Sequence, residues 1–304
     1  MDTLHLLLTA ITVIFIAATM FAAGLGTTLP TLRAILTAPL LLVLALTANL
    51  IAVPLLGWGV ATLFSLPTAA FVATVLIASS PGGPFGAKLG MIQKGDVVAG
   101  AAMQVLLAAV GSLTFGPTVN AVLTAANVGG DVSLDVAALV RTVAVLQLIP
   151  FAVGLITRHY APAMARSWHP AAVAVSNVSF LIVLAGMLLG NWRDIAALTG
   201  SRTLLAGFVL AVTAFATGAL LATGTPQRRS TMGGVTAVRN VGPALAAVGL
   251  AFDDSPAVLG ALAAFLLSGL AVSLPIAAVL GRHRAGDVGG CILRHASATR
   301  DSGS

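Results

Sequence analysis

The chain has 304 residues, of which 58% are hydrophobic and only 8% are charged, and its mean hydropathy is +1.05. A soluble domain carries about 25% charged residues, so this composition excludes a water-soluble protein. The formal net charge of +6 is not accompanied by any patch of aromatic and basic residues, and we expect no nucleic-acid partner. Basic excess in such a chain is typical of orientation in a lipid bilayer.

Apolar segments long enough to cross a bilayer recur along the whole sequence. About 20 apolar residues span the hydrocarbon core, which is ~30 Å thick. The sequence predicts nine spans, at 4–23, 38–64, 67–93, 96–121, 135–158, 170–190, 203–223, 229–251 and 255–281. The polar stretch 285–304 contains glycine and serine and predicts a disordered tail after a transmembrane domain, 1–284.

Nine spans place the two termini on opposite sides of the membrane. If the tail is inside, three basic residues lie outside, namely Arg141, Arg193 and Arg202. The inner side then carries Arg33, Lys94, Arg158, Arg166, Arg228, Arg229, Arg282, Arg284, Arg294 and Arg300. The positive-inside rule requires this bias. It predicts a cytoplasmic C-terminus, and we expect the protein in the inner (plasma) membrane of a bacterium.

Two of the predicted spans contain helix breakers at corresponding positions. The segment 80–84 (Ser-Pro-Gly-Gly-Pro) interrupts the third span, and 240–243 (Asn-Val-Gly-Pro) interrupts the eighth. Broken helices persist at membrane depth where they are packed in protein or line a cavity. One in each half is typical of transporters built from inverted repeats, with the site at the breaks. We predict an all-α membrane protein with repeat halves at about 1–125 and 130–284.

The inventory of reactive side chains argues against an enzyme. All nine acidic residues are Asp, and each lies in a loop, at a helix end or in the tail. The single cysteine, Cys291, lies in the polar tail, and the sequence has no His/Cys cluster with metal-ligand spacing and no phosphate-binding glycine loop. We expect no enzymatic activity and no cofactor.

Two basic residues, Lys88 and Arg239, fall inside predicted spans and close to the two breaks. The spans contain no acidic residue to pair with them, and an unpaired cation inside a membrane is costly. An anionic substrate, the partially negative C-terminal end of a half-helix, or extension of the side chain to the interface could each compensate the charge.

Four stretches resemble, in order and spacing, the bile acid:sodium symporter family. They are 20–25 (Met-Phe-Ala-Ala-Gly-Leu), 66–67 with 80–83 (Leu-Pro, then Ser-Pro-Gly-Gly), 94–97 (Lys-Gly-Asp-Val) and 240–246 (Asn-Val-Gly-Pro-Ala-Leu-Ala). The resemblance implies a core domain with two crossing discontinuous helices, packed on a panel domain. It also implies transport of an organic anion by motion of one domain against the other.

The sequence departs from this family at the positions of its sodium ligands. The matching residues are Gly86, Ala87, Val235 and Arg239, none of which offers a side-chain oxygen. Asn49 keeps an amide where the family has Gln. The family's hydroxyls after the third span correspond to Gly100 and Ala102, which leaves Gln104 as the nearest polar group. Our hypothesis is that Lys88 and Arg239 take the place of the two sodium ions, and whether sodium is a coupling ion stays open.

We therefore expect a secondary transporter that moves a small organic anion by alternating access. The residues expected to bind substrate or ion are Asn49, Ser80, Gly82, Gly83, Lys88, Gln104, Arg239, Asn240, Gly242 and Ser268. One alternative is a conventional sodium-coupled symporter, and another is an auxin-carrier-like transporter. A non-transporting receptor or a passive channel is an alternative of a different class. The sequence identifies neither the substrate nor the oligomeric state.

Overall fold

The computed structural model describes residues 3–83, 85–128, 135–190, 193, 202–252 and 254–301. Every regular element in these ranges is a helix, which confirms the predicted all-α class. Within the described ranges, eight helical segments are long and apolar enough to cross a membrane. The predicted span at 67–93 is not among them, because it consists of two short helices, Thr68–Ala78 and Phe85–Ile92. These are the two halves of the first broken helix.

The helices follow the predicted order. They are α1 (Thr3–Gly26), α2 (Leu29–Leu36), α3 (Pro39–Thr47), the π-helix η1 (Ala48–Ala52), α4 (Val53–Leu63), α5 (Thr68–Ala78), α6 (Phe85–Ile92), α7 (Val97–Ala125), α8 (Val136–Tyr160), α9 (Pro162–Gly190), α11 (Arg202–Leu221), α12 (Pro226–Ala237), α13 (Val241–Ala251) and α14 (Pro256–Asp301).

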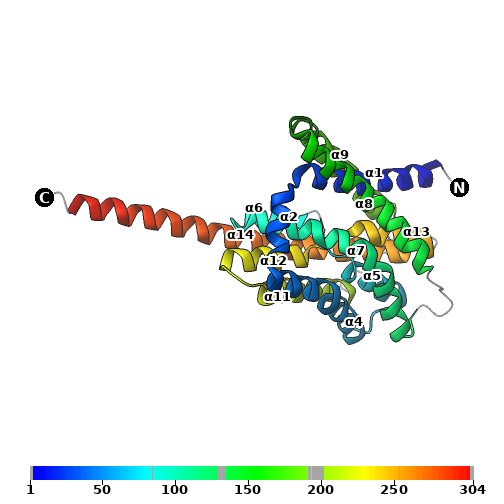
Figure 1. The fold of residues 1–304 in the computed structure, drawn as a ribbon. Helices are drawn as coiled ribbons and strands as arrows, with labels where there is room; N and C mark the ends of the chain where they lie inside the picture. Colours follow the sequence, from blue (N-terminus) through cyan, green and yellow to red (C-terminus); the bar gives the residue numbers. More distant parts are fainter. Residues whose placement is uncertain are drawn as a thin grey trace.

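The helices pack in two groups. Helix α1 packs along α8 and α9, and Figure 1 shows these three together on one side of the molecule. We call them the panel group. The core group comprises α3 to α7 and α11 to α14, in which α11 packs on α12 and α14, and α5 packs on α4 and α14. The groups meet where α7 and α13 contact α8 and where α14 contacts α9. Both broken helices lie in the core group.

A glycine contact holds α1 against α8. A Cβ atom added at Gly24 would lie 2.8 Å from the backbone nitrogen of Leu155 and 3.0 Å from Cα of Gly154. A Cβ at Gly154 would lie 2.5 Å from the carbonyl oxygen of Phe21. The two backbones can approach this closely only because neither residue has a side chain, as at other membrane helix interfaces. The glycine of the 20–25 motif therefore has a packing role.

The Lys-Gly-Asp-Val stretch joins the two broken helices at one end of the molecule. Asp96 caps α7 by accepting a hydrogen bond from the backbone N–H of Ala99 at 3.0 Å. Its other carboxylate oxygen pairs with Nε of Arg228 in α12 at 2.8 Å, and its backbone N–H donates to Oγ1 of Thr231 at 3.0 Å. The loop that follows α6 is therefore fixed to the first turns of α12.

Helix α14 is longer than expected. The predicted disorder of 285–304 differs from the structure, in which the helix continues to Asp301 and extends away from the body of the protein (Figure 1). No proline follows Pro275, so nothing in this stretch removes a backbone donor and ends the helix. Residues 302–304 lie outside the described part of the chain.

We predict that Gly24→Ala lowers the thermal unfolding temperature of the detergent-solubilised protein, measured by tryptophan fluorescence. The added methyl group would overlap the backbone of α8, and overpacking of this kind costs about 1–3 kcal/mol. Gly59→Ala is the matched control, because a Cβ atom there meets nothing within 4 Å. An equal unfolding temperature for both variants would contradict the proposed packing role.

Candidate functional site

The first break follows α5, which ends at Ala78. Pro81 has no backbone N–H to continue the helix. Gly82 follows with φ +78°, in the left-handed region that glycine occupies without strain. A Cβ atom there would lie 2.7 Å from Cα of Ala108 and 2.8 Å from the carbonyl oxygen of Gln104. The loop between α5 and α6 is thus pressed against α7, and only glycine fits.

The second break separates α12 from α13. Val238 and Asn240 have extended backbone conformations, so the chain runs straight for about three residues between the two helices. Asn240 then caps α13, since its Oδ1 accepts a hydrogen bond from the N–H of Gly242 at 3.1 Å. Pro243 in the first turn of α13 needs no intrahelical donor.

The two breaks cross in contact with each other. The backbone N–H of Asn240 donates to the carbonyl oxygen of Ser80 at 2.8 Å. A Cβ atom on Gly83 would lie 2.6 Å from the carbonyl carbon of Arg239 and 2.7 Å from the carbonyl oxygen of Val238. The crossing predicted from the Pro-Gly-Gly and Asn-Val-Gly segments is therefore a direct backbone contact.

Arg239 lies at this crossing and is only 7% exposed. Its guanidinium donates five hydrogen bonds, which equals the number of its N–H groups. Nη2 bonds to the carbonyl oxygen of Ala78 at 2.6 Å, and Nε bonds to that of Ile77 at 3.3 Å. Nη1 donates to Oδ1 of Asn49 at 2.7 Å. The two remaining bonds reach the carbonyl oxygens of Thr236 at 3.3 Å and Asn49 at 3.1 Å.

Of the three compensations that the sequence allowed for Arg239, the structure provides the end of a half-helix. The carbonyl groups of Ile77 and Ala78 are the last of α5 and carry its partial negative charge. The guanidinium therefore caps α5 from the other broken helix.

The π-helix η1 supplies the oxygen atoms of Asn49. The backbone N–H of Val53 bonds to the carbonyl of Ala48, and Pro54 has no N–H. The carbonyl oxygen of Asn49 instead accepts from Arg239. The side-chain Nδ2 of Asn49 donates to Oγ1 of Thr236 at 3.1 Å, which orients its Oδ1 toward the guanidinium. The local widening of the helix thus presents two acceptors to one cation, and such bulges are frequent at functional sites.

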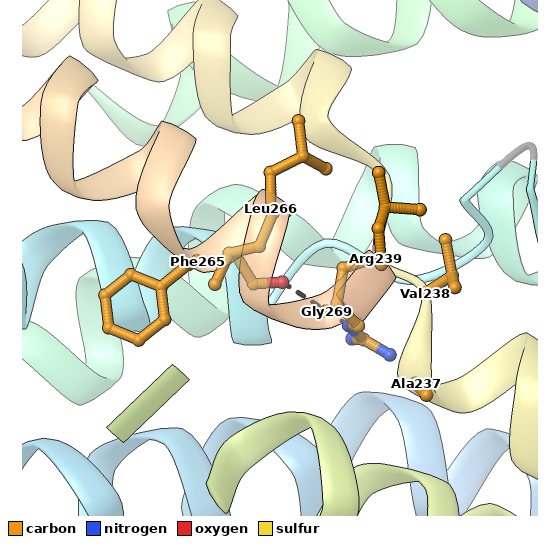
Figure 2. A pocket seen from close by; sticks show the side chains of 8 residues that line it. Ala237, Val238, Arg239, Phe265, Leu266 and Gly269 are labelled. Carbon is orange, nitrogen blue, oxygen red and sulfur yellow. Dashed lines mark hydrogen bonds between the residues drawn. The ribbon is translucent and has the colours of Figure 1, made fainter. Parts of the chain in front are cut away.

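A small cavity of about 30 Å³ adjoins the crossing. In Figure 2, Phe265, Leu266 and Gly269 of α14 stand on one side of it, and Ala237 to Arg239 stand on the other. Its volume is that of one or two water molecules. In this conformation the cavity is too small for an organic anion.

Lys88 lies on α6 and reaches into the panel group. Its Nζ donates to Oδ1 of Asn177 in α9 at 2.9 Å and lies 4.9 Å from the centre of the Phe85 ring. Asn177 is near the middle of α9, so Lys88 does not extend to the membrane surface in this structure.

A second polar contact links the core and panel groups. Oε1 of Gln147, near the middle of α8, accepts hydrogen bonds from Nδ2 of Asn240 and from Oγ of Ser112 in α7, both at 3.2 Å. Gln147 is only 1% exposed. Sequence reasoning missed Gln147 and Asn177, although an amide inside an apolar span is itself a signal.

The remaining predicted residues are dispersed around the crossing. Gln104 is buried on α7, and Gly242 packs on Ile16 of α1. Ser268 donates to the carbonyl oxygen of Ala264 at 2.9 Å and packs on Gly207 of α11, within the core group.

Two of the positions that the resemblance assigns to sodium ligands, Gly86 and Val235, pack against each other. A Cβ atom on Gly86 would lie 2.9 Å from Cα of Val235, so these two positions touch each other across α6 and α12. The side chain of Ala87 lies outside the described part of the structure. The hydroxyl groups of Ser79 and Ser80 are buried at the first break and have no hydrogen-bond partner among the described residues.

Comparison with known proteins identifies the family of this chain. A family model described as the sodium bile acid symporter family matches residues 13–198, which is more than half of the chain. The chain belongs to the sodium bile acid symporter family. Members of this family are transporters. The assignment therefore confirms the expectation that the protein is not an enzyme. The matched part includes the first break and ends before the second.

A curated relative from Oryza sativa subsp. japonica is named "Probable sodium/metabolite cotransporter BASS3, chloroplastic". It is 27% identical over 180 residues, which are 59% of this chain and 41% of the relative. The matched region therefore spans about two fifths of the relative's length. As a member of the sodium bile acid symporter family, the chain is an integral, multi-pass membrane protein of a solute transporter family.

We predict that Arg239→Lys lowers the thermal unfolding temperature, because lysine has three donors where the site has five acceptors in use. Each buried acceptor left unpaired costs about 1–3 kcal/mol. Arg229→Lys is the control, since Arg229 is exposed on α12, the helix that precedes the second break. A shift no larger than that of the control would show that the guanidinium does not hold the crossing together.

Proposed function

We propose that this chain is a secondary transporter that moves a small organic anion by alternating access and does not use sodium as the coupling ion. The observation that carries the proposal is the set of five hydrogen bonds from Arg239 to oxygen atoms at the crossing. A tethered cation supplies charge compensation at this point. It supplies no ion gradient, so transport would be uniport or anion exchange.

The residues at the crossing do not fit a sodium ion. A hard cation requires several oxygen ligands, commonly including a carboxylate. The carbonyl oxygens of Ile77, Ala78 and Asn49 already accept from Arg239. Gly86 and Val235 touch each other and offer no side-chain oxygen. The chain contains no glutamate, and the ion pair Asp96–Arg228 lies at the start of α7, away from the breaks.

An anionic substrate is favoured by the charges around the crossing. Arg239 carries positive charge there and Lys88 carries it on α6, and the described residues place no carboxylate beside either one. Helices α6 and α13 both begin at the breaks, and the N-terminal end of a helix attracts negative charge.

Movement of the core group against the panel group would provide alternating access. The crossing lies in the core group, and the Asn240–Gln147 contact joins it to the panel group.

Arg284 of α14 donates to the carbonyl of Gln93 after α6 and to Oγ of Ser230 in α12. Lys94, Arg228 and Arg284 therefore gather at one end of the molecule, which we assign to the cytoplasm of a bacterium.

A sodium-coupled symporter is the second candidate. The buried hydroxyl groups of Ser79 and Ser80, without a partner among the described residues, are the observation that favours it. The relative from Oryza sativa subsp. japonica, whose name includes sodium, also favours this candidate.

We predict that proteoliposomes containing the protein take up pyruvate or cholate at the same rate with an inward sodium gradient and with an equal potassium gradient. Protein-free liposomes give the background. Several-fold stimulation by sodium would reject the proposal in favour of the second candidate.

We also predict that sodium sensitivity can be restored by reversing two departures from the family. In the double variant Val235→Glu and Arg239→Gln, the oxygens at the crossing lose their tethered cation and gain a carboxylate. Its unfolding temperature should be higher in sodium than in equimolar potassium, whereas the wild type should show no difference. Val235→Glu combined with Arg229→Gln is the control. A sodium-insensitive double variant would argue that Arg239 does not stand in for an ion.

A further inference from the structure

We propose that Lys88 binds the carboxylate of the transported anion. When no substrate is bound, Lys88 donates a hydrogen bond to Asn177 instead, and this bond opposes movement of the empty carrier. This inference rests on the proposed anion transport. It assigns the recognition residue and predicts that exchange is several-fold faster than uniport.

The geometry places Lys88 between the two groups of helices. Its ammonium group donates to Oδ1 of Asn177 at 2.9 Å across the boundary from α6 to α9. Phe85, on the same helix as Lys88, packs its ring 5.2 Å from that of Phe180 on α9. Nearby, Ser176 bonds to Thr19 at 2.6 Å within the panel group. Asn177 is thus held by the panel, while Lys88 belongs to the core.

Asn177 is a weaker partner than a carboxylate. Its amide oxygen is neutral, whereas a hydrogen bond between an ammonium group and a carboxylate is charge-assisted and roughly twice as strong. The ammonium group of Lys88 has three N–H donors, and one of them is used in a hydrogen bond to a described residue. The Phe85 ring, 4.9 Å away, stabilises the cation without using a donor. A substrate carboxylate can therefore displace the amide of Asn177.

Displacement has a consequence for movement. The Lys88–Asn177 bond joins two groups that must shift relative to each other during transport. The other side-chain bonds described here between them, from Asn240 and from Ser112 to Gln147, are both longer at 3.2 Å and join neutral groups. A carboxylate on Lys88 would remove the charged link and leave the neutral ones. The loaded carrier would then move more readily than the empty carrier.

The first test is binding, and it separates competition from structural damage. We expect Asn177→Leu to bind cholate and pyruvate roughly fivefold more tightly than the wild type, the gain from losing one competing hydrogen bond. The readout is thermal stabilisation of the purified protein. Lys88→Met should lose this stabilisation, and Lys88→Arg should retain it. Ser176→Ala, which alters a bond within the panel, is the control and should match the wild type.

The second test is transport. Proteoliposomes loaded with radiolabelled pyruvate are diluted into buffer with or without external pyruvate, both free of sodium. The wild type should exchange several-fold faster than it releases, and Asn177→Leu should bring the two rates close together. Wild-type exchange with an unchanged ratio in Asn177→Leu would overturn the role of Asn177 and leave the proposed function standing. Pyruvate flux that occurs only with sodium would overturn the proposed function itself.

Discussion

Backbone groups freed inside a membrane must find partners within the protein, and this requirement determines the centre of the molecule. Two helices stop within membrane-spanning segments, and each stop frees carbonyl and N–H groups that lipid cannot satisfy. The breaks satisfy one another through the Asn240–Ser80 bond, and Arg239 satisfies the end of α5. Asn49 then presents two oxygens to the same guanidinium because Pro54 leaves its carbonyl available. Three segments distant in sequence, those of Asn49, Ala78 and Arg239, are joined at one side chain.

The two membrane cations have different surroundings. Arg239 is held by five acceptors within the core group, whereas Lys88 reaches a single neutral acceptor in the panel group. A charge with all its donors in use acts mainly by its field and by the contacts it maintains. A charge with donors remaining can exchange partners. This difference separates a structural substitute for an ion from a recognition residue, and it assigns distinct parts of the proposed mechanism to the two residues.

Much of the fold could be predicted from the sequence because its determinants are local. Proline and glycine clusters identify the breaks, and apolar runs identify the spans. The partners of Arg239 could not be predicted from the sequence, because Asn49 lies 190 positions away. The carbonyl oxygen of Asn49 can accept from Arg239 because of a π-helix, which no local sequence pattern predicts. Gln147 and Asn177 were not predicted for a similar reason, because their contacts depend on which helix faces them. The length of α14 was also misjudged, because a polar composition does not by itself end a helix.

The contacts of Arg284 have a mechanical consequence. Its bonds to the ends of α6 and α12 fasten three segments of the core group at one point, and α14 runs on past that point to Asp301. The same helix borders the cavity at the crossing further back, at Phe265 to Leu270. The projecting part of α14 is therefore a rod rooted in the group that carries the crossing. If the core group moves during transport, a partner bound to the projecting part of α14 would move together with the crossing.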